Sequence, residues 1–183
     1  MDEKKLAVIF PGIGYTKDKP LLYYASRLLR SLGYEILSME YHDLPGKIQG
    51  DRAMMKKAAE IAYEQVCEQF SDVAFSEYED VVFVGKSIGT VVAAVYGREH
   101  DMHCRQVWYT PVEATFSFGH TNVIAFLGDK DPWSDVNEDK RLAKEQGIEL
   151  FMYPDCNHSL ECADVDKNIE IMRDVMKKTA MWI

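Results

Sequence analysis

Short apolar runs alternate with longer segments of helical periodicity along this sequence. The apolar runs, rich in Val, Ile and aromatic residues, occupy positions 6–10, 34–41, 80–85, 105–110, 122–128 and 148–153. Such runs are typical of strands that are buried on both faces. Alternation of buried strands with helices predicts a mostly parallel six-stranded sheet in a three-layer α/β/α arrangement.

The segments between these runs carry signals for helix boundaries. Pro20 begins an amphipathic pattern that Gly33 ends, which is the expected asymmetry of the two residues. Asp51 is a candidate cap for a helix that reaches position 70, and another helix starts behind Ser87. Further helices are expected from Ser134 or Asp135 to position 147 and over positions 165–182.

Composition limits the class of protein. The 183 residues suit one domain over positions 1–183, and 47% of them are hydrophobic, as in folded proteins. A formal charge of −9 argues against nucleic acid as a partner, and no run is long enough to insert into a membrane. The residues MDEKK followed by an apolar strand do not resemble a signal peptide, so we expect a cytoplasmic protein.

Cysteine and histidine spacing gives no sign of a metal or a disulfide framework. The four cysteines form no CxxC pair, and nothing near His100 and His103 completes a zinc site. No motif for a cofactor is present either. We therefore expect reduced thiols, no metal and no cofactor.

The stretch VVFVGKSIGTVVAAVYG allows two interpretations. Its GKS could be the end of a phosphate-binding loop, and its GKSIG could be a nucleophile motif. A Walker A loop would need glycine at position 80, which is Asp80, and a loop where this chain has a strand. A dinucleotide-binding motif starting at Gly12 fails because Lys17 stands where the third glycine belongs. Neither interpretation as a nucleotide site is supported.

The same stretch matches G-x-S-x-G between a strand and a helix. Such a turn raises a serine hydroxyl above the sheet, and its glycines avoid collisions with the neighbouring strand and helix. Ser87 is then the nucleophile. Lys86 needs no catalytic role, and we expect its side chain to point to solvent. The alternative is that Ser87 only caps the helix that follows it.

Two later strand ends supply the partners that a nucleophilic serine needs. Asp129 and Asp131 follow the fifth strand, and His158 follows the sixth. A serine hydroxyl needs a histidine base, and the imidazole needs a carboxylate that fixes its tautomer. The order Ser, acid, His and the shared sheet edge predict a triad.

These motifs resemble the α/β-hydrolase superfamily over nearly the whole chain, through FPGIGY, GKSIG, LGDKDPW and CNHS. The resemblance implies that Asp131 is the acid and that Asp129 structures the turn. It also implies an oxyanion hole from the N–H groups of Ile13 and Ile88. Pro11 stands where many relatives have histidine, and a simple tight turn is the alternative for PGIG.

The resemblance also implies a minimal fold. The two leading strands of the family are absent, the strand order is 2-1-3-4-5-6, and the connection at positions 111–121 is too short for a cap. We therefore expect a shallow, open site with no lid. Its candidate substrate-binding residues are Tyr15, Tyr41, Thr110 and Phe116, each of which could equally be a packing residue.

The function that the resemblance implies is a serine hydrolase acting on a small-molecule ester or thioester. Two alternatives stay open, namely a binding or regulatory module on the same fold and an amidase or peptidase with the same triad. An exposed edge strand would also permit a homodimer.

Overall fold

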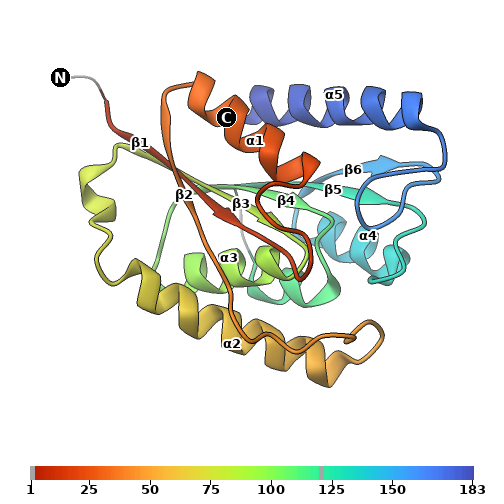
Figure 1. Cartoon of the computed structure of the whole chain (residues 1–183), viewed down its shortest axis with the longest axis horizontal. Helices are drawn as coiled ribbons and strands as arrows, with labels where there is room; N and C mark the ends of the chain where they lie inside the picture. Colours follow the sequence, from red (N-terminus) through yellow and green to blue (C-terminus); the bar gives the residue numbers. More distant parts are fainter. Residues whose placement is uncertain (1–2, 120–121) are drawn as a thin grey trace.

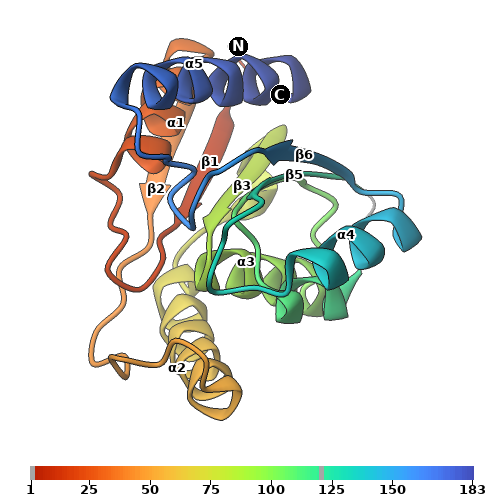
Figure 2. The same ribbon diagram turned by 90° about the vertical axis from the view of Figure 1, so that its right-hand side faces the viewer.

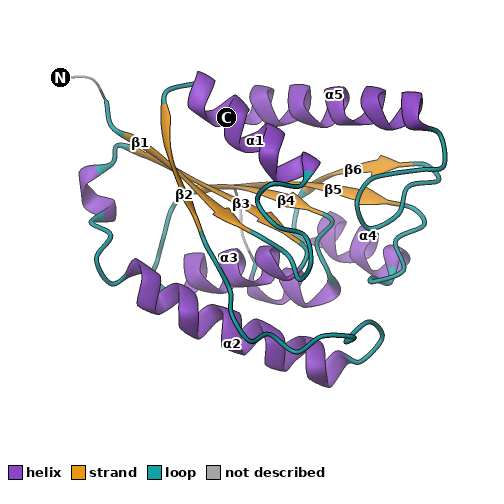
Figure 3. Cartoon of the chain, viewed as in Figure 1, coloured by secondary structure: helices purple, strands orange, loops and turns teal. Residues whose placement is uncertain are grey.

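A six-stranded, all-parallel β-sheet forms the middle layer of the molecule, and Figure 3 shows it in orange between the helices. This computed structural model describes residues 3–119 and 122–183. The strands are β1 (Lys5–Phe10), β2 (Tyr34–Ser38), β3 (Asp80–Lys86), β4 (Arg105–Tyr109), β5 (Val123–Gly128) and β6 (Glu149–Tyr153). Their order, β2-β1-β3-β4-β5-β6, confirms the predicted fold class and topology. The direction of crossover changes between β1 and β3, where ligands bind in sheets of this kind.

Helices cover both faces of this sheet (Figures 1 and 2). One face carries α1 (Pro20–Ser31) and α5 (Val165–Trp182). The other carries α2 (Arg52–Phe70), α3 (Ile88–Glu99) and α4 (Val136–Glu145), with two short 3₁₀ helices, η1 (Phe75–Glu77) and η2 (Glu113–Phe118). None of the helices in the described ranges has the length and apolar character needed to cross a bilayer.

Successive residues of β3 pack in two separate apolar cores, one on each face of the sheet. Val84 packs in the core that contains Leu22 of α1 and Val175 of α5. Its neighbour Phe83 packs in the other core, which contains Val66 of α2. Burial of a side chain such as Leu22 stabilises the fold by about 2 kcal/mol. Both cores are required because both faces of the sheet are apolar.

Aspartate side chains cap the first turns of α2 and α4. Asp51 accepts the N–H of Met54, so it caps α2. Asp135, rather than Ser134, caps α4 by accepting the N–H groups of Asn137 and Glu138. Each cap satisfies backbone donors that have no partner within the helix.

The second strand is shorter than predicted because two glutamine side chains of α2, and not a neighbouring strand, pair with the backbone that follows it. Positions 39–41 were expected in the strand, which ends at Ser38. Beyond it, Gln69 hydrogen-bonds both the N–H and the C=O of Glu40. Gln65 does the same for His42. These side-chain amides satisfy backbone groups that a further strand residue would have paired within the sheet.

The connection between β4 and β5 contains η2 and, in its described part, no α-helix. The predicted absence of a cap insertion at this place is therefore confirmed as far as residue 119, since residues 120–121 lie outside the described ranges. The loops that carry the motifs follow the carboxyl ends of β1, β3, β5 and β6.

Candidate active site

Ser87 occupies a sharp turn between β3 and α3. Its backbone has φ 55° and ψ −123°, a conformation that few residues other than glycine adopt. Two hydrogen bonds hold the turn, from Ser87 N–H to Tyr109 O (3.0 Å) and from Thr90 N–H to Ser87 O (2.9 Å). Backbone strain of this kind persists only where the surroundings enforce it. The turn therefore has the geometry of a nucleophile elbow.

Glycines on both sides allow this turn to pack closely. A Cβ atom on Gly89 would lie 2.1 Å from the carbonyl oxygen of Phe10, at the end of β1. A Cβ atom on Gly85 would lie 2.7 Å from Thr90 Cα. Neither contact can be relieved without moving α3 away from the sheet, so the positions of the G-x-S-x-G glycines follow from sterics.

The Ser87 hydroxyl faces a histidine and does not cap its helix. Its side chain makes no capping hydrogen bond to α3, which removes the alternative explanation of the motif. Instead, Ser87 Oγ lies 2.8 Å from His158 Nε2. The two residues are 71 positions apart in sequence and come from different strand ends.

Asp131 lies on the far side of the imidazole. Its Oδ2 is 2.6 Å from His158 Nδ1, and its Oδ1 accepts the N–H of Trp133 at 2.9 Å. The Asp131 side chain is 0% exposed. Both carboxylate oxygens are thus engaged, which fixes the carboxylate and orients the ring.

Asp129 stabilises the turn after β5, which is the role that the resemblance implied. Its Oδ1 accepts the N–H of Asp155 at 2.6 Å, and the N–H of Lys130 is donated to Cys156 O at 3.0 Å. These two bonds join the loop after β5 to the loop after β6. The joined loops hold Asp131 and His158 in register.

His158 sits in a largely desolvated place, with 15% of its side chain exposed. Burial, followed by the positive charge of Lys86, lowers its pKa, and Asp131 opposes this shift. The ring of Trp133 stacks on it, with centroids 5.4 Å apart. Burial therefore favours the neutral imidazole, which is the form that can accept a proton.

The prediction that Lys86 points to solvent is wrong. Lys86 is 0% exposed, and its Nζ lies 4.8 Å from the centre of the Tyr15 ring. The reason is the alternation of β3, in which Val82, Val84 and Lys86 face the same core. Lys86 thus lies beneath the turn and beside the other charged groups of the site.

The PGIG loop lies directly against the elbow. Gly12 and Tyr15 exchange two backbone hydrogen bonds and close a tight turn with Ile13 in it. A Cβ atom on Gly12 would lie 3.2 Å from Lys86 O and 3.3 Å from Ser87 Cβ, so any larger residue would press against the turn. Ile88 is the first residue of α3, where a backbone N–H has no partner within its helix.

No protein-family model and no curated protein matches this sequence. Solved structures do match in three dimensions. A lidless α/β serine hydrolase from Xanthomonas campestris has a TM-score of 0.68 at 16% identity, over 98% of this chain and 82% of the other. The chain has the α/β-hydrolase fold.

Two further structures with this fold are similar. An α/β serine hydrolase homologue from Coxiella burnetii has a TM-score of 0.66 at 16% identity, covering 96% of this chain and 84% of the other. An esterase from Pyrococcus furiosus has a TM-score of 0.70 at 12% identity, covering 98% and 82%. At these identities the likeness establishes the fold alone.

Within this α/β-hydrolase fold, the four residues predicted to bind substrate lie in the core or pack against it. Tyr15 is 9% exposed, and its hydroxyl accepts the N–H of Leu21. Thr110 is fully buried, and Phe116 packs its ring edge-on against Trp108. Tyr41 packs partly buried against the α2 side of the core, with its hydroxyl buried. As placed, these four side chains pack beside the loops of the site, and their part in substrate binding stays a prediction.

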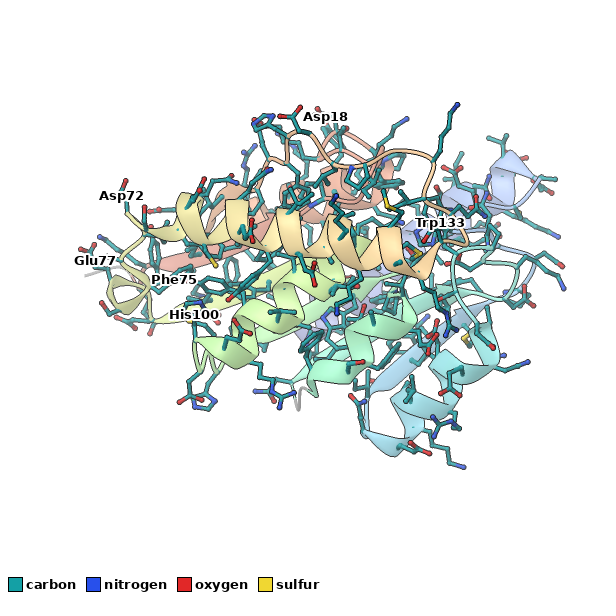
Figure 4. All side chains as sticks on the ribbon, turned by 90° about the horizontal axis from the view of Figure 1, so that it is seen from below. Asp18, Asp72, Phe75, Glu77, His100 and Trp133 are labelled. Carbon is teal, nitrogen blue, oxygen red and sulfur yellow. The ribbon has the colours of Figure 1, made fainter. Side chains whose placement is uncertain are left out.

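An apolar cluster that the sequence analysis missed joins the functional loops. We call it the rim cluster, and it consists of Ile13, Ile48, Met54, Met55, Ala58, Ala59, Ile88 and Trp133. Ile88 follows the Ser87 position, and Trp133 stacks on His158. Figure 4 shows Trp133 beside the first turns of α2. No local pattern signals this cluster, because its members come from four separate segments.

The connection from β2 to α2 reaches across the α/β-hydrolase sheet edge to the Asp131 loop. Gln49 Nε2 donates to Pro132 O at 3.2 Å, and Arg52 pairs with Glu113 of η2 at 2.8 Å. Both bonds are exposed, so each contributes little stability. The site lacks a cap insertion in the described chain, and this connection borders one side of it.

Proposed function

We propose that this chain is a serine hydrolase that cleaves an ester or a thioester through an acyl-enzyme. The observation that carries the proposal is the line of contacts Ser87 Oγ, His158 and Asp131, with distances of 2.8 and 2.6 Å. The strained backbone of Ser87 and the similarity to an esterase fold add support. All three side chains come from loops at the carboxyl edge of the sheet.

In the proposed reaction, Ser87 Oγ attacks the carbonyl carbon while His158 Nε2 takes the hydroxyl proton. Asp131 stabilises the imidazolium that forms. The N–H groups of Ile88 and Ile13 receive the oxyanion, and each such donor is worth about 3 kcal/mol in known hydrolases. His158 then protonates the leaving alcohol or thiol. Water, activated by the same imidazole, attacks the acyl-enzyme and releases the acid.

The proposed substrate side is the rim cluster. Its side chains are apolar, five of the eight are only partly buried, and it joins Ile88 and Ile13 to Trp133, which stacks on His158. An apolar surface of this kind favours an uncharged acyl group. Met55 and Ala59, on the first turns of α2, would then limit the length of the acyl chain.

A fluorophosphonate probe tests the nucleophile directly. We expect the wild-type protein to be labelled and Ser87→Ala to lose labelling, while Ser159→Ala, a matched hydroxyl on the His158 loop, keeps it. His158→Gln should slow labelling by about 10³-fold or more. Labelling that persists in Ser87→Ala would refute the assignment.

A series of acyl esters, thioesters and amides tests the substrate class, with kcat/KM as the readout. Met55→Ala should shift the preference to longer acyl chains, and Met181→Ala, on an exposed turn of α5, is its matched control. Labelling without turnover of any member would favour a binding module instead. Preferential turnover of amides would favour an amidase or peptidase.

A further inference from the structure

Lys86 is a buried charge that the proposed reaction does not use. It is fully buried directly before Ser87, and no hydrogen-bond partner for its Nζ occurs in residues 3–119 or 122–183. Buried ammonium groups are normally paired, because desolvation of the charged form is costly. A side chain of this kind beside a reactive serine calls for a functional explanation.

Two tyrosines lie beside Lys86, one against its ammonium and one on the neighbouring strand. Its Nζ lies over the Tyr15 ring at 4.8 Å, a distance at which the ring face attracts a cation. Tyr109 is its neighbour across the β3–β4 ladder. Burial raises the pKa of Tyr15 to about 12 and also raises that of Tyr109. Both phenols therefore stay neutral through the range in which histidine titrates.

The charged groups around Lys86 belong to the site itself. Burial lowers the pKa of Lys86 to about 7, and the Asp131 carboxylate opposes that shift. In turn, the ammonium lowers the pKa of His158, second only to burial. Glu161, on the His158 loop, acts on Tyr15. A proton on Lys86 thus disfavours a proton on His158, while the carboxylate of Asp131 favours both.

We propose that Lys86 is a positioning residue that takes up the proton of the site in mildly acidic solution and thereby keeps His158 free to act as a base. A solvent proton adds to Lys86 Nζ and not to His158 Nε2, and no other bond changes. In alkaline solution Lys86 becomes neutral and no longer repels the imidazolium that forms during acyl transfer. The inference rests on the proposed hydrolase function and adds a pH regulation to it.

The first test is the pH profile of kcat/KM, or of the rate of fluorophosphonate labelling, for wild type and Lys86→Met. Loss of the ammonium should raise the pKa of His158, so the acidic limb should move up by about one pH unit, which means about tenfold less activity at about pH 5.5. Above about pH 8 the two profiles should converge, because Lys86 is then neutral in the wild type as well.

The matched control is Lys130→Met, the same substitution at an exposed lysine on the Asp131 loop. Its charge is screened by water, so the acidic limb should stay in place. A role of Lys86 in packing alone would lower activity equally at every pH. That result, or an unmoved limb in Lys86→Met, overturns the proposal.

A second test needs no turnover. The ring-proton NMR signal of His158, assigned by its loss in His158→Gln, should titrate in the wild type with a second inflection from Lys86 near neutral pH. The second inflection should vanish in Lys86→Met. A single-step titration in the wild-type protein refutes the coupling even if Lys86→Met does not fold. Failure of the hydrolase proposal would show separately, as absence of probe labelling and of ester turnover.

Discussion

Replacing Lys86 by methionine should stabilise the folded protein, and the gain should disappear in alkaline solution. Methionine is similar in length to lysine and carries no charge. The pKa of the buried ammonium falls from 10.5 to about 7. Between these pH values the unfolded chain binds a proton that the folded chain does not. Stability of the wild type therefore rises with pH across this window.

The magnitude follows from the same two pKa values. The interval between 10.5 and about 7, at about 1.4 kcal/mol per pH unit, corresponds to about 5 kcal/mol of destabilisation below pH 7. This is an upper limit, because local rearrangement of the site relieves part of the cost. Loss of the contact with the Tyr15 ring subtracts about 1 kcal/mol. We expect Lys86→Met to be more stable by roughly 2–4 kcal/mol at neutral pH and equal to wild type near the pKa of free lysine.

Urea unfolding followed by circular dichroism, repeated at several pH values from about 6 to about 10.5, measures the difference in free energy of unfolding between the two proteins. Lys130→Met should show no pH-dependent gain, because the exposed Lys130 keeps its hydration. A Lys86→Met protein that is no more stable at neutral pH would refute the reasoning, and so would a gain of the same size at every pH. A confirmed gain would mean that this α/β-hydrolase fold gives up stability for a charge in its site, as functional sites often do.

Three other substitutions test separate parts of the site. Asp131→Asn should keep the fold and lower kcat by about 10³- to 10⁴-fold, since the amide favours the wrong tautomer of His158; circular dichroism and ester kinetics measure both. Gly89→Ala should lower the free energy of unfolding by about 3 kcal/mol or more, because its Cβ meets Phe10 O at 2.1 Å, and an unchanged melting temperature would contradict this. Trp133→Leu should expose His158 to water and raise its pKa, which moves the acidic limb of kcat/KM to higher pH, and an unmoved limb would show that Trp133 does not shield the imidazole.

Local patterns predicted most of the secondary structure, because helix caps and the apolar runs of strands buried on both faces depend only on residues close together in the sequence. Where the expected strand at 34–41 ends early, the cause is distant, because Gln65 and Gln69 of α2 bond the backbone that follows Ser38. The burial of Lys86 was open to prediction. Its two-residue spacing from Val84 places both on one face of β3, and only its charge argued for solvent.

By itself, the sequence determined the order of strands and helices, and it indicated the three residues of the proposed triad. It could do so because hydrophobic periodicity, turn glycines and strand-end positions are local properties whose geometry is nearly fixed. Only the tertiary structure decided what surrounds Ser87. The distances to His158, the rim cluster under α2 and the ammonium of Lys86 held against Tyr15 all join segments far apart in the chain. Packing, which acts between such segments, sets the environment and therefore the acidity of the groups that would carry out the reaction.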